Sequence, residues 1–557
     1  MHHGLPIPKK PIHGGLFMKH AATWRAMWLR AILPAMCCGF ASGSISAAAS
    51  AGVPRSAAQA HHFVNYTAIL EKRLSKAVTP QNNAAIGILA VGRRSVARIL
   101  ATWKMVNGKY VSIPNRPLER ELMLGLGLNA PWFTGPRYEK LSRYLKHRPM
   151  QTLRTSHGTR TAAWYAKEVS YAGQIELHAL KRPWSEKRFP WLAEWLRWNS
   201  PALNKVVRAT RLPRFYCPLL TKHPTTGVWG TLMPYLSTTI SLSDALCVRA
   251  MLELDEHHFK ACEADLLATH RLAQLVSRSS GYLISVLVGE VIGSRASEAD
   301  AAMANAAWIP AKDYLAYEAK LSKLSGMTSI YPAVERVGRF ICLDSLQRMG
   351  SNRFLAAVRR MPGYPGGTHG IFGGKAWPPR YVKTATATAN LILNREAAAI
   401  RHHDSLVRYH AYRRFMKWRA HLLAHHNPSI PFQVQAAVGW FTQPFPRAIV
   451  IRTRSVAASK LSRAALILAA YRAAHGRYPK TLHQLVPEYI RAIPKDPFTD
   501  AHIGYHRGKA RVRLWTLNNF VDLRHPPPPY AHLRQFVTLS IPPGRYVWPK
   551  VLPAPPP

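Results

Sequence analysis

Carboxylate and imidazole side chains gather at one point of the sequence, where they could bind a metal ion. Residues 253–258 contain five of them: Glu253, Asp255, Glu256, His257 and His258. Oxygen and imidazole ligands in one loop suit divalent metal ions. The same composition is typical of a solvated turn between two helices, and we favour that interpretation.

Histidines form a second group that could chelate a metal. His421 and His425 stand four residues apart, a spacing that places both side chains on one face of a helix. No H-E-x-x-H motif accompanies them. Nearby cations would repel a metal ion, namely Arg413, Arg414, Lys417 and Arg419. The other members of the group lie on the same predicted helix: His402, His403, Asp404, His410 and His426. We predict no metal site here.

A glycine-rich segment is the third candidate for chemistry. Residues 362–380 read PGYPGGTHGIFGGKAWPPR, and a phosphate-binding loop ending at Lys375 would need Gly at 369 and Ser or Thr at 376. The chain has His369 and Ala376 instead. The segment therefore predicts a surface loop or lid. The sequence also lacks a G-x-S-x-G motif and a paired-carboxylate motif. We assign no catalytic, cofactor-binding or metal-binding residue, predict no cofactor and favour a protein that is not an enzyme.

The elements that carry these residues are predicted to be helical. Residues 52–361 form the expected helical body, and residues 381–454 continue it, with one long helix over 381–423. Residues 245–254 and 260–276 predict an antiparallel helical pair. The fold class is therefore mainly α, as a helical bundle or an irregular array of helical hairpins, with a small C-terminal α+β unit.

That unit is predicted over residues 455–525. Apolar residues recur there at three- and four-residue spacing, which marks one face of a helix: Leu461, Ala464, Ala465, Leu468 and Tyr471. Gly476 stands where a left-handed residue ends a helix, and Pro479 prevents its continuation. Residues 503–506 and 511–517 alternate apolar and polar side chains, as a hairpin does. Asp496, before Pro497, is expected to hold the loop between helix and hairpin through backbone hydrogen bonds.

Several short motifs of this unit follow one another in a known order. They are Tyr471-Arg472, Gly476-Arg477-Tyr478-Pro479, Pro494-Lys495-Asp496-Pro497-Phe498, Tyr505 and Leu514-Trp515-Thr516-Leu517. Residues 455–519 thereby resemble the major pseudopilins of type II secretion. The resemblance implies a long helix, a G-R-Y-P turn, a P-K-D-P loop and a small antiparallel sheet. The whole chain resembles long exported bacterial proteins of unknown function that carry this ending after a helical body.

The two ends of the chain have their own composition. Residues 1–51 are typical of an export signal, with an apolar run over 31–47, an Ala49-Ser50-Ala51 cleavage site and the basic residues Lys19, Arg25 and Arg30. Cleavage and retention as a membrane anchor are both open, and we favour cleavage. Both place the protein in the periplasm or on the outer side of the cytoplasmic membrane. Residues 526–557 predict a Pro-rich tail.

Charge limits the classes of partner. The chain has 76 Lys and Arg against 27 Asp and Glu, a net charge of +49, and the basic residues occur in nearly every block of the sequence. Diffuse positive charge fits adaptation to an acidic environment or contact with anionic lipid or polymer. A nucleic-acid binder concentrates such residues on one face or arm, so we expect no nucleic acid. Cysteine is sparse, and disulfides and buried free thiols are both open for Cys217, Cys247, Cys262 and Cys342.

Three hypotheses for function remain. The leading one is a non-catalytic structural or protein-interaction component of the bacterial envelope, with a protein partner and an undetermined oligomeric state. The second is a hydrolase-type enzyme with a site under the glycine-rich loop. The third is a binder of anionic polymer or nucleic acid. A basic stripe on the surface favours the third, and a pocket lined by His and carboxylates favours the second.

Overall fold

The computed structural model describes the helical body and the C-terminal unit, with gaps. The described residues are 64–90, 103–106, 109–112, 152–155, 158–161, 178–221, 224–233, 235–324, 326, 328–359, 375–424, 430–517 and 534–541. The predicted export signal, the glycine-rich loop up to residue 374, His425, His426 and the end of the tail lie outside them.

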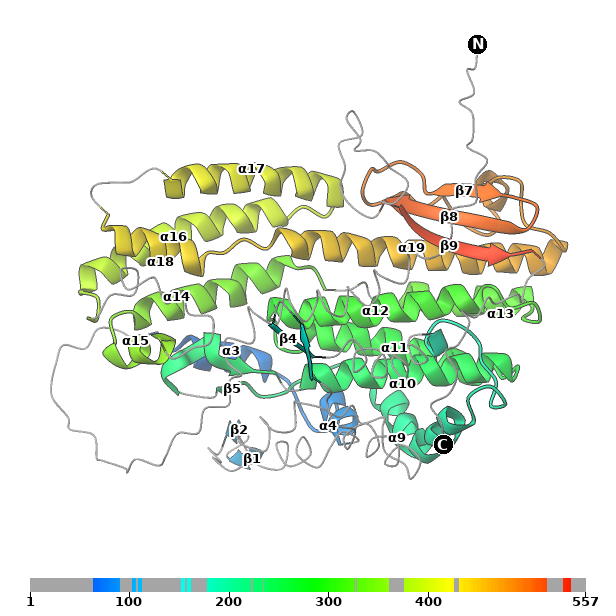
Figure 1. Cartoon of the computed structure of the whole chain (residues 1–557), viewed down its shortest axis with the longest axis horizontal. Coiled ribbons are helices and arrows are strands. Elements are labelled where there is room, and N and C mark those ends of the chain that lie inside the picture. The colour runs from blue at the N-terminus through cyan, green and yellow to red at the C-terminus, as the bar shows by residue number, and fades with distance from the viewer. Residues whose placement is uncertain are drawn as a thin grey trace, which may run out of the picture.

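The described chain is mainly helical, with small antiparallel sheets (Figure 1). Its α-helices are α3 (Tyr66–Leu74), α4 (Ala84–Leu89), α9 (Pro190–Ala209), α10 (Tyr235–Asp255), α11 (Phe259–Arg278), α12 (Leu283–Met303), α13 (Ala311–Lys323), α14 (Arg339–Arg348), α15 (Asn352–Arg359), α16 (Pro379–Ile400), α17 (Ser405–Ala424), α18 (Phe432–Phe441) and α19 (Pro446–His475). The predicted fold class is confirmed.

Helices α10 to α13 form one part of the core. The predicted antiparallel pair is confirmed as α10 and α11, both longer than expected. Arg249 and Asp265 join the two helices through a buried ion pair of 2.6 Å. Small residues let α11 and α12 approach closely, since a Cβ on Gly293 would lie 3.7 Å from the Cβ of Ala273. Breaking such a buried ion pair on one side typically costs about 3–5 kcal/mol.

Helices α14 to α18 form a second apolar cluster, which corrects one prediction. The helix expected over residues 381–423 is two helices, α16 and α17, with a break after Ile400. Asp404 accepts a 2.7 Å hydrogen bond from the Val407 amide at the start of α17. Arg408 donates to the carbonyls of His402 (2.7 Å) and His403 (2.8 Å). These bonds satisfy backbone groups that a break in a helix leaves open.

Helix α19 connects the two clusters. It has 30 residues and extends along the long axis of the molecule (Figure 1), about 45 Å at 1.5 Å per residue. Ile449 and Ala457 pack in the cluster of α14–α18, whereas Leu461 and Leu468 pack with α10–α13. The helix therefore holds both parts together.

The C-terminal sheet has three strands, β7 (Gly504–Arg507), β8 (Arg511–Leu517) and β9 (Arg534–Ser540), in the order β7-β8-β9. The predicted hairpin is confirmed, with Tyr505 opposite Leu514. Strand β9 corrects the prediction of a tail only, since residues 534–540 pair along the whole of β8. Val512, Leu514 and Leu539 face α19 in the core. Leu468 of α19 is buried there, as predicted.

The region expected to be a helical body also contains strands and 3-10 turns. Three two-stranded hairpins lie in it: β1 (Trp103–Val106) with β2 (Lys109–Ser112), β3 (Thr152–Thr155) with β4 (Gly158–Thr161), and β5 (Leu220–Thr221) with β6 (Thr231–Leu232). The remaining short elements are the 3-10 helices η1 (Pro224–Gly230) and η3 (Leu482–Leu485) and the π-helix η2 (Ala333–Gly338). The strands of the three hairpins have four residues or fewer, and hydrophobic periodicity over so few residues does not predict a strand.

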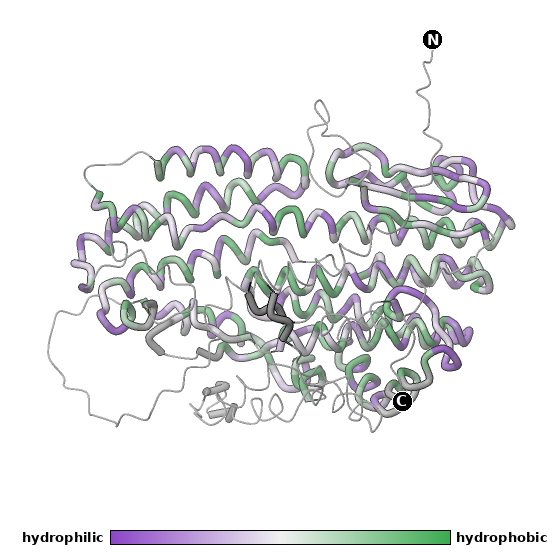
Figure 2. The backbone as a smooth tube through the Cα atoms, viewed as in Figure 1, coloured by the Kyte–Doolittle hydropathy of each residue, from purple (hydrophilic) through white to green (hydrophobic). Residues whose placement is uncertain are grey.

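Hydrophobic and hydrophilic residues alternate along the helices (Figure 2). Among the described residues, no helix combines the length and the apolar character needed to cross a membrane. The four cysteines of the body are buried free thiols, so this open question is settled in favour of thiols. Burial raises the pKa of Cys217 to about 12, so the thiol stays neutral near pH 7.

Candidate functional site

The C-terminal motif is joined to the three-stranded sheet by hydrogen bonds at Tyr478, Pro479 and Asp496. Gly476 ends α19 with φ 71°, the left-handed conformation predicted for it. The carbonyl of Tyr478 accepts a 2.8 Å hydrogen bond from Arg507, and the carbonyl of Pro479 accepts a 2.6 Å hydrogen bond from the Tyr505 hydroxyl. Arg477, between Gly476 and Tyr478, is exposed. Strand β7 therefore holds the G-R-Y-P turn.

Asp496 holds the other end of the motif. Its two carboxylate oxygens accept 2.8 Å hydrogen bonds from the amides of Phe498 and Leu517, and Pro497 stands between Asp496 and Phe498. This is the structural role predicted for Asp496. The bonds fix the loop to the last residue of β8.

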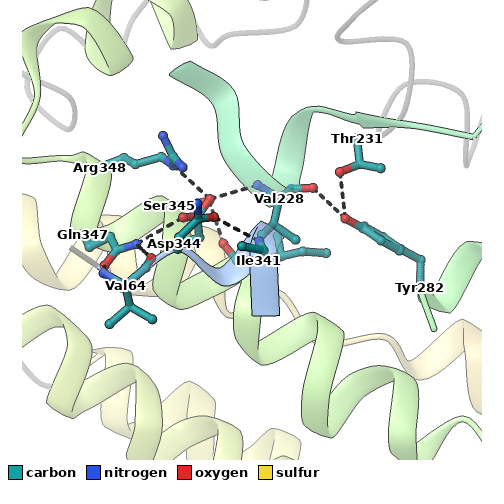
Figure 3. Close-up of polar contacts among 11 residues, drawn as sticks. Val64, Val228, Thr231, Tyr282, Ile341, Asp344, Ser345, Gln347 and Arg348 are labelled. Carbon is teal, nitrogen blue, oxygen red and sulfur yellow. Dashed lines mark hydrogen bonds and ion pairs between the residues drawn. The ribbon is translucent and has the colours of Figure 1, made fainter. Parts of the chain in front are cut away.

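A second carboxylate, Asp344 of α14, fixes the loop η1 to the helical core (Figure 3). It accepts from the Val228 amide (2.9 Å), Gln347 Nε2 (3.1 Å) and Arg348 Nε (2.9 Å). The Tyr282 hydroxyl donates to the carbonyl of Val228 at 2.9 Å from the other side. No local pattern in the sequence indicates this network, because its members come from three distant segments.

The carboxylate and imidazole cluster forms the turn between α10 and α11, as the favoured interpretation predicted. His258 Nδ1 lies 3.0 Å from a Glu253 oxygen and 3.5 Å from a Glu256 oxygen. One ligand atom from each of the three lies within 4.8 Å of the others, so they could hold a metal ion. His258 and Glu256 are exposed. Partial burial of the carboxyl group, together with the nearby Glu253 charge, raises the pKa of Glu256. The geometry is that of a solvated ion-pair cluster. The predicted His421–His425 pair lies partly outside the described residues.

Most carboxylates of the core have a structural partner. Eight are buried in the described chain, namely Asp244, Glu263, Asp265, Glu290, Asp300, Asp344, Glu396 and Asp496, against three arginines and no lysine. Asp300 contacts His270 (2.8 Å) and Tyr317 (2.6 Å), and Glu290 pairs with Arg452. Because the interior takes up so many of the few acids, the surface is more cationic than the composition alone indicates.

The exposed charges are unevenly distributed. Between residues 375 and 447 the described chain exposes nine Lys and Arg but one carboxylate, Asp404. The other exposed carboxylates with an assigned exposure are Asp255, Glu256, Glu298, Glu488 and Asp500. All five belong to the part of the molecule around α10–α13 and the sheet, away from α18 (Figure 1). The predicted diffuse charge therefore has one nearly acid-free region, on α16–α18.

Helix α17 lies at the centre of this nearly acid-free region. Its inner side buries Arg408, Ala411, Tyr412 and Phe415. Its outer side exposes a stripe at helical spacing, formed by His410, Arg413, Arg414, Lys417 and His421, which we call the basic stripe. The helix contains no acidic residue and lies at the edge of the molecule (Figure 1). In the sequence, these cations were considered only because they would repel a metal ion. Their i, i+3 and i+4 spacing already indicates that they cluster on one face of the helix.

Comparison of the chain with protein-family models, curated proteins and solved structures found no match.

Proposed function

We propose that this protein is a non-catalytic structural or interaction component of the bacterial envelope, and that it holds an anionic partner on α16–α18. The observation that carries the anionic partner, and so brings in part of the third hypothesis, is the basic stripe: three cations and two imidazoles on a helix without a carboxylate. Like charges on one face repel each other, and an anionic partner relieves this repulsion.

The export signal expected in residues 1–51 supports the envelope as location. The pseudopilin resemblance gains support from the long helix, the Gly476 turn, the Asp496 loop and the antiparallel sheet. We extend it to a pseudopilin-like C-terminal unit that serves as a rigid structural part. The hydrolase hypothesis has less support, because the eight buried carboxylates of the described chain all have hydrogen-bond or ion-pair partners.

The test is binding of the full chain to labelled linear polyphosphate, followed by fluorescence anisotropy at low and high salt. In the stripe variant, Arg413→Gln, Arg414→Gln and Lys417→Gln, we expect the affinity to fall at least tenfold and the salt dependence to weaken.

The matched control removes three exposed cations elsewhere, by Lys312→Gln, Lys323→Gln and Arg491→Gln. Its net charge is the same as that of the stripe variant, so only the position differs. Equal loss of affinity in both variants, or no binding by the unchanged protein, would contradict the proposal.

A further inference from the structure

The outer side of α18 exposes two aromatic side chains beside one polar residue, Gln433, although the surface around it is charged. Val434, Ala437 and Val438 are buried on one side of this helix. Phe432 and Trp440, eight residues apart, are exposed on the other side, with Phe445 just beyond the helix. A helix that packs on one side only normally has a polar outer side. The outer side of α18 therefore indicates a contact with an apolar medium or partner.

Exposed apolar side chains concentrate in this region. The five most exposed large ones in the described chain are Phe432 (65%), Leu391 (48%), Val407 (48%), Phe445 (42%) and Phe536 (41%). Four of the five lie on α16, α17, α18 or directly before α19. Single exposed apolar residues are ordinary, whereas a group of them marks an interaction surface.

The helices that carry the basic stripe and the exposed Phe432 and Trp440 adjoin each other. Arg419 of α17 donates a 2.7 Å hydrogen bond to the carbonyl of Gly439, and Gln435 of α18 donates a 3.0 Å hydrogen bond to the carbonyl of Leu423. Residues 405–487 contain no Asp or Glu. The exposed Asp404 precedes α17, about 30 Å along this 20-residue helix from the end that meets α18. No exposed carboxylate among the described residues of α17 and α18 opposes a negative surface.

We propose that the basic stripe and the exposed side chains Phe432, Trp440 and Phe445 together dock on the surface of a bilayer that contains anionic phospholipid. This inference rests on the proposed function and names its partner. Lys and Arg near an anionic leaflet gain from its surface potential, and aromatic side chains settle at the level of the headgroups.

Other occupants fit less well. Two copies of this face would place two cationic stripes against each other, which is unfavourable. Single-stranded nucleic acid would use only the aromatic rings, by stacking. The exposed aliphatic Leu391 and Val407 gain from the acyl region of a bilayer instead.

The experiment is cosedimentation of the full chain with vesicles of phosphatidylcholine alone and with vesicles of equal parts phosphatidylcholine and phosphatidylglycerol. We expect binding to the anionic vesicles only. The double variant Phe432→Ser and Phe445→Ser should bind them about 100-fold more weakly but keep its affinity for polyphosphate. The stripe variant should lose affinity for the anionic vesicles and for polyphosphate. The matched control Phe536→Ser, of similar exposure but on β9, should lose neither.

The outcomes separate the two proposals. If the unchanged protein binds polyphosphate but not anionic vesicles, the bilayer inference is overturned and the proposed function stands. If the unchanged protein binds neither, both proposals are overturned. A dimer in sedimentation equilibrium that the Phe432→Ser and Phe445→Ser changes dissociate identifies a second copy as the occupant. Tighter binding of single-stranded RNA that depends on the same two residues identifies nucleic acid. Each of these results also overturns the inference. Circular dichroism of every variant confirms that the exposed substitutions leave the fold intact.

Discussion

The carboxylate of Asp496 accepts a 2.8 Å hydrogen bond from the backbone amide of Leu517, 21 residues later in the chain. Its second oxygen accepts from the Phe498 amide. Phe498 and Leu517 both pack in the cluster of α14–α18, whereas Val512 and Leu514 of the same sheet pack with α10–α13. A single side chain therefore fixes the place where the C-terminal sheet meets both parts of the core.

Removal of this side chain should be costly. Asp496→Ala leaves two buried amides without an acceptor, and each unsatisfied group costs about 1–3 kcal/mol. We expect the free energy of unfolding in urea, followed by circular dichroism, to fall by about 2–5 kcal/mol. Asp500→Asn is the control, since Asp500 forms an exposed ion pair with Lys495 and should change stability by less than about 1 kcal/mol. Equal effects of the two substitutions would refute the role of Asp496.

The turn after α19 allows a test of backbone conformation alone. Gly476 has φ 71°, and a Cβ built on it meets nothing within 4 Å. Gly476→Ala should therefore lower the free energy of unfolding by about 1 kcal/mol through the left-handed conformation only. Gly326→Ala is a matched control, because its Cβ also meets nothing and its φ is not positive. Thermal melts of both variants decide the point, and a Gly476→Ala variant as stable as the control would show that the helix ends differently.

Local signals explain which parts of the fold the sequence predicts. Gly476, the apolar face that includes Leu468, and the alternation over β8 all lie within a few residues of what they determine. The same holds for the α10–α11 hairpin. Strand β9 lies after a Pro-rich segment and gains its order from pairing with β8, so its own residues give little indication of it. Tertiary context decides such strands.

The candidate interface illustrates a second limit. The cations of α17 are visible in the sequence, but their exposure depends on the break at 401–404, which Arg408 and Asp404 stabilise. The exposed Phe432 and Trp440 belong to a helix whose only polar side chains are Gln433 and Gln435, and periodicity does not tell its outer side from its inner side. Only the packing of α18 against Leu423 distinguishes them.

The network around Asp344 should be sensitive to a single methyl group. Gly227 has φ 59°, and a Cβ there would lie 1.8 Å from an Asp344 oxygen. Gly227→Ala should displace η1 from α14 and lower the free energy of unfolding by about 3 kcal/mol or more, from strain and from the lost acceptor of Val228. Gly350→Ala, whose Cβ meets only ordinary contacts beginning at 3.5 Å, is the control. Limited proteolysis should cleave the Gly227→Ala chain faster near η1. Equal cleavage in both variants would contradict the network.

Glu396 is a buried group that should contribute to the pH dependence of the fold. Its side chain is 1% exposed in the cluster of α14–α18. One oxygen accepts 2.7 Å from the Tyr412 hydroxyl, whose oxygen in turn accepts 2.7 Å from the Phe445 amide before α19. Burial raises the pKa of Glu396 from 4.5 to about 7, against the opposing effects of the Tyr412 hydrogen bond and the Arg419 charge.

A raised pKa means that the folded chain holds a proton which the unfolded chain releases between pH 4.5 and about 7. The contribution of Glu396 to stability is therefore most favourable below pH 4.5, falls as the pH rises through this window by about 3 kcal/mol, and stays constant above it. Glu396→Gln keeps an acceptor for Tyr412 but cannot ionise. The free energy of unfolding of the unchanged protein, measured in urea, should fall relative to that of Glu396→Gln as the pH rises. The exposed Glu488→Gln variant should run parallel to the unchanged protein, and parallel curves for Glu396→Gln would show that Glu396 does not titrate in this range.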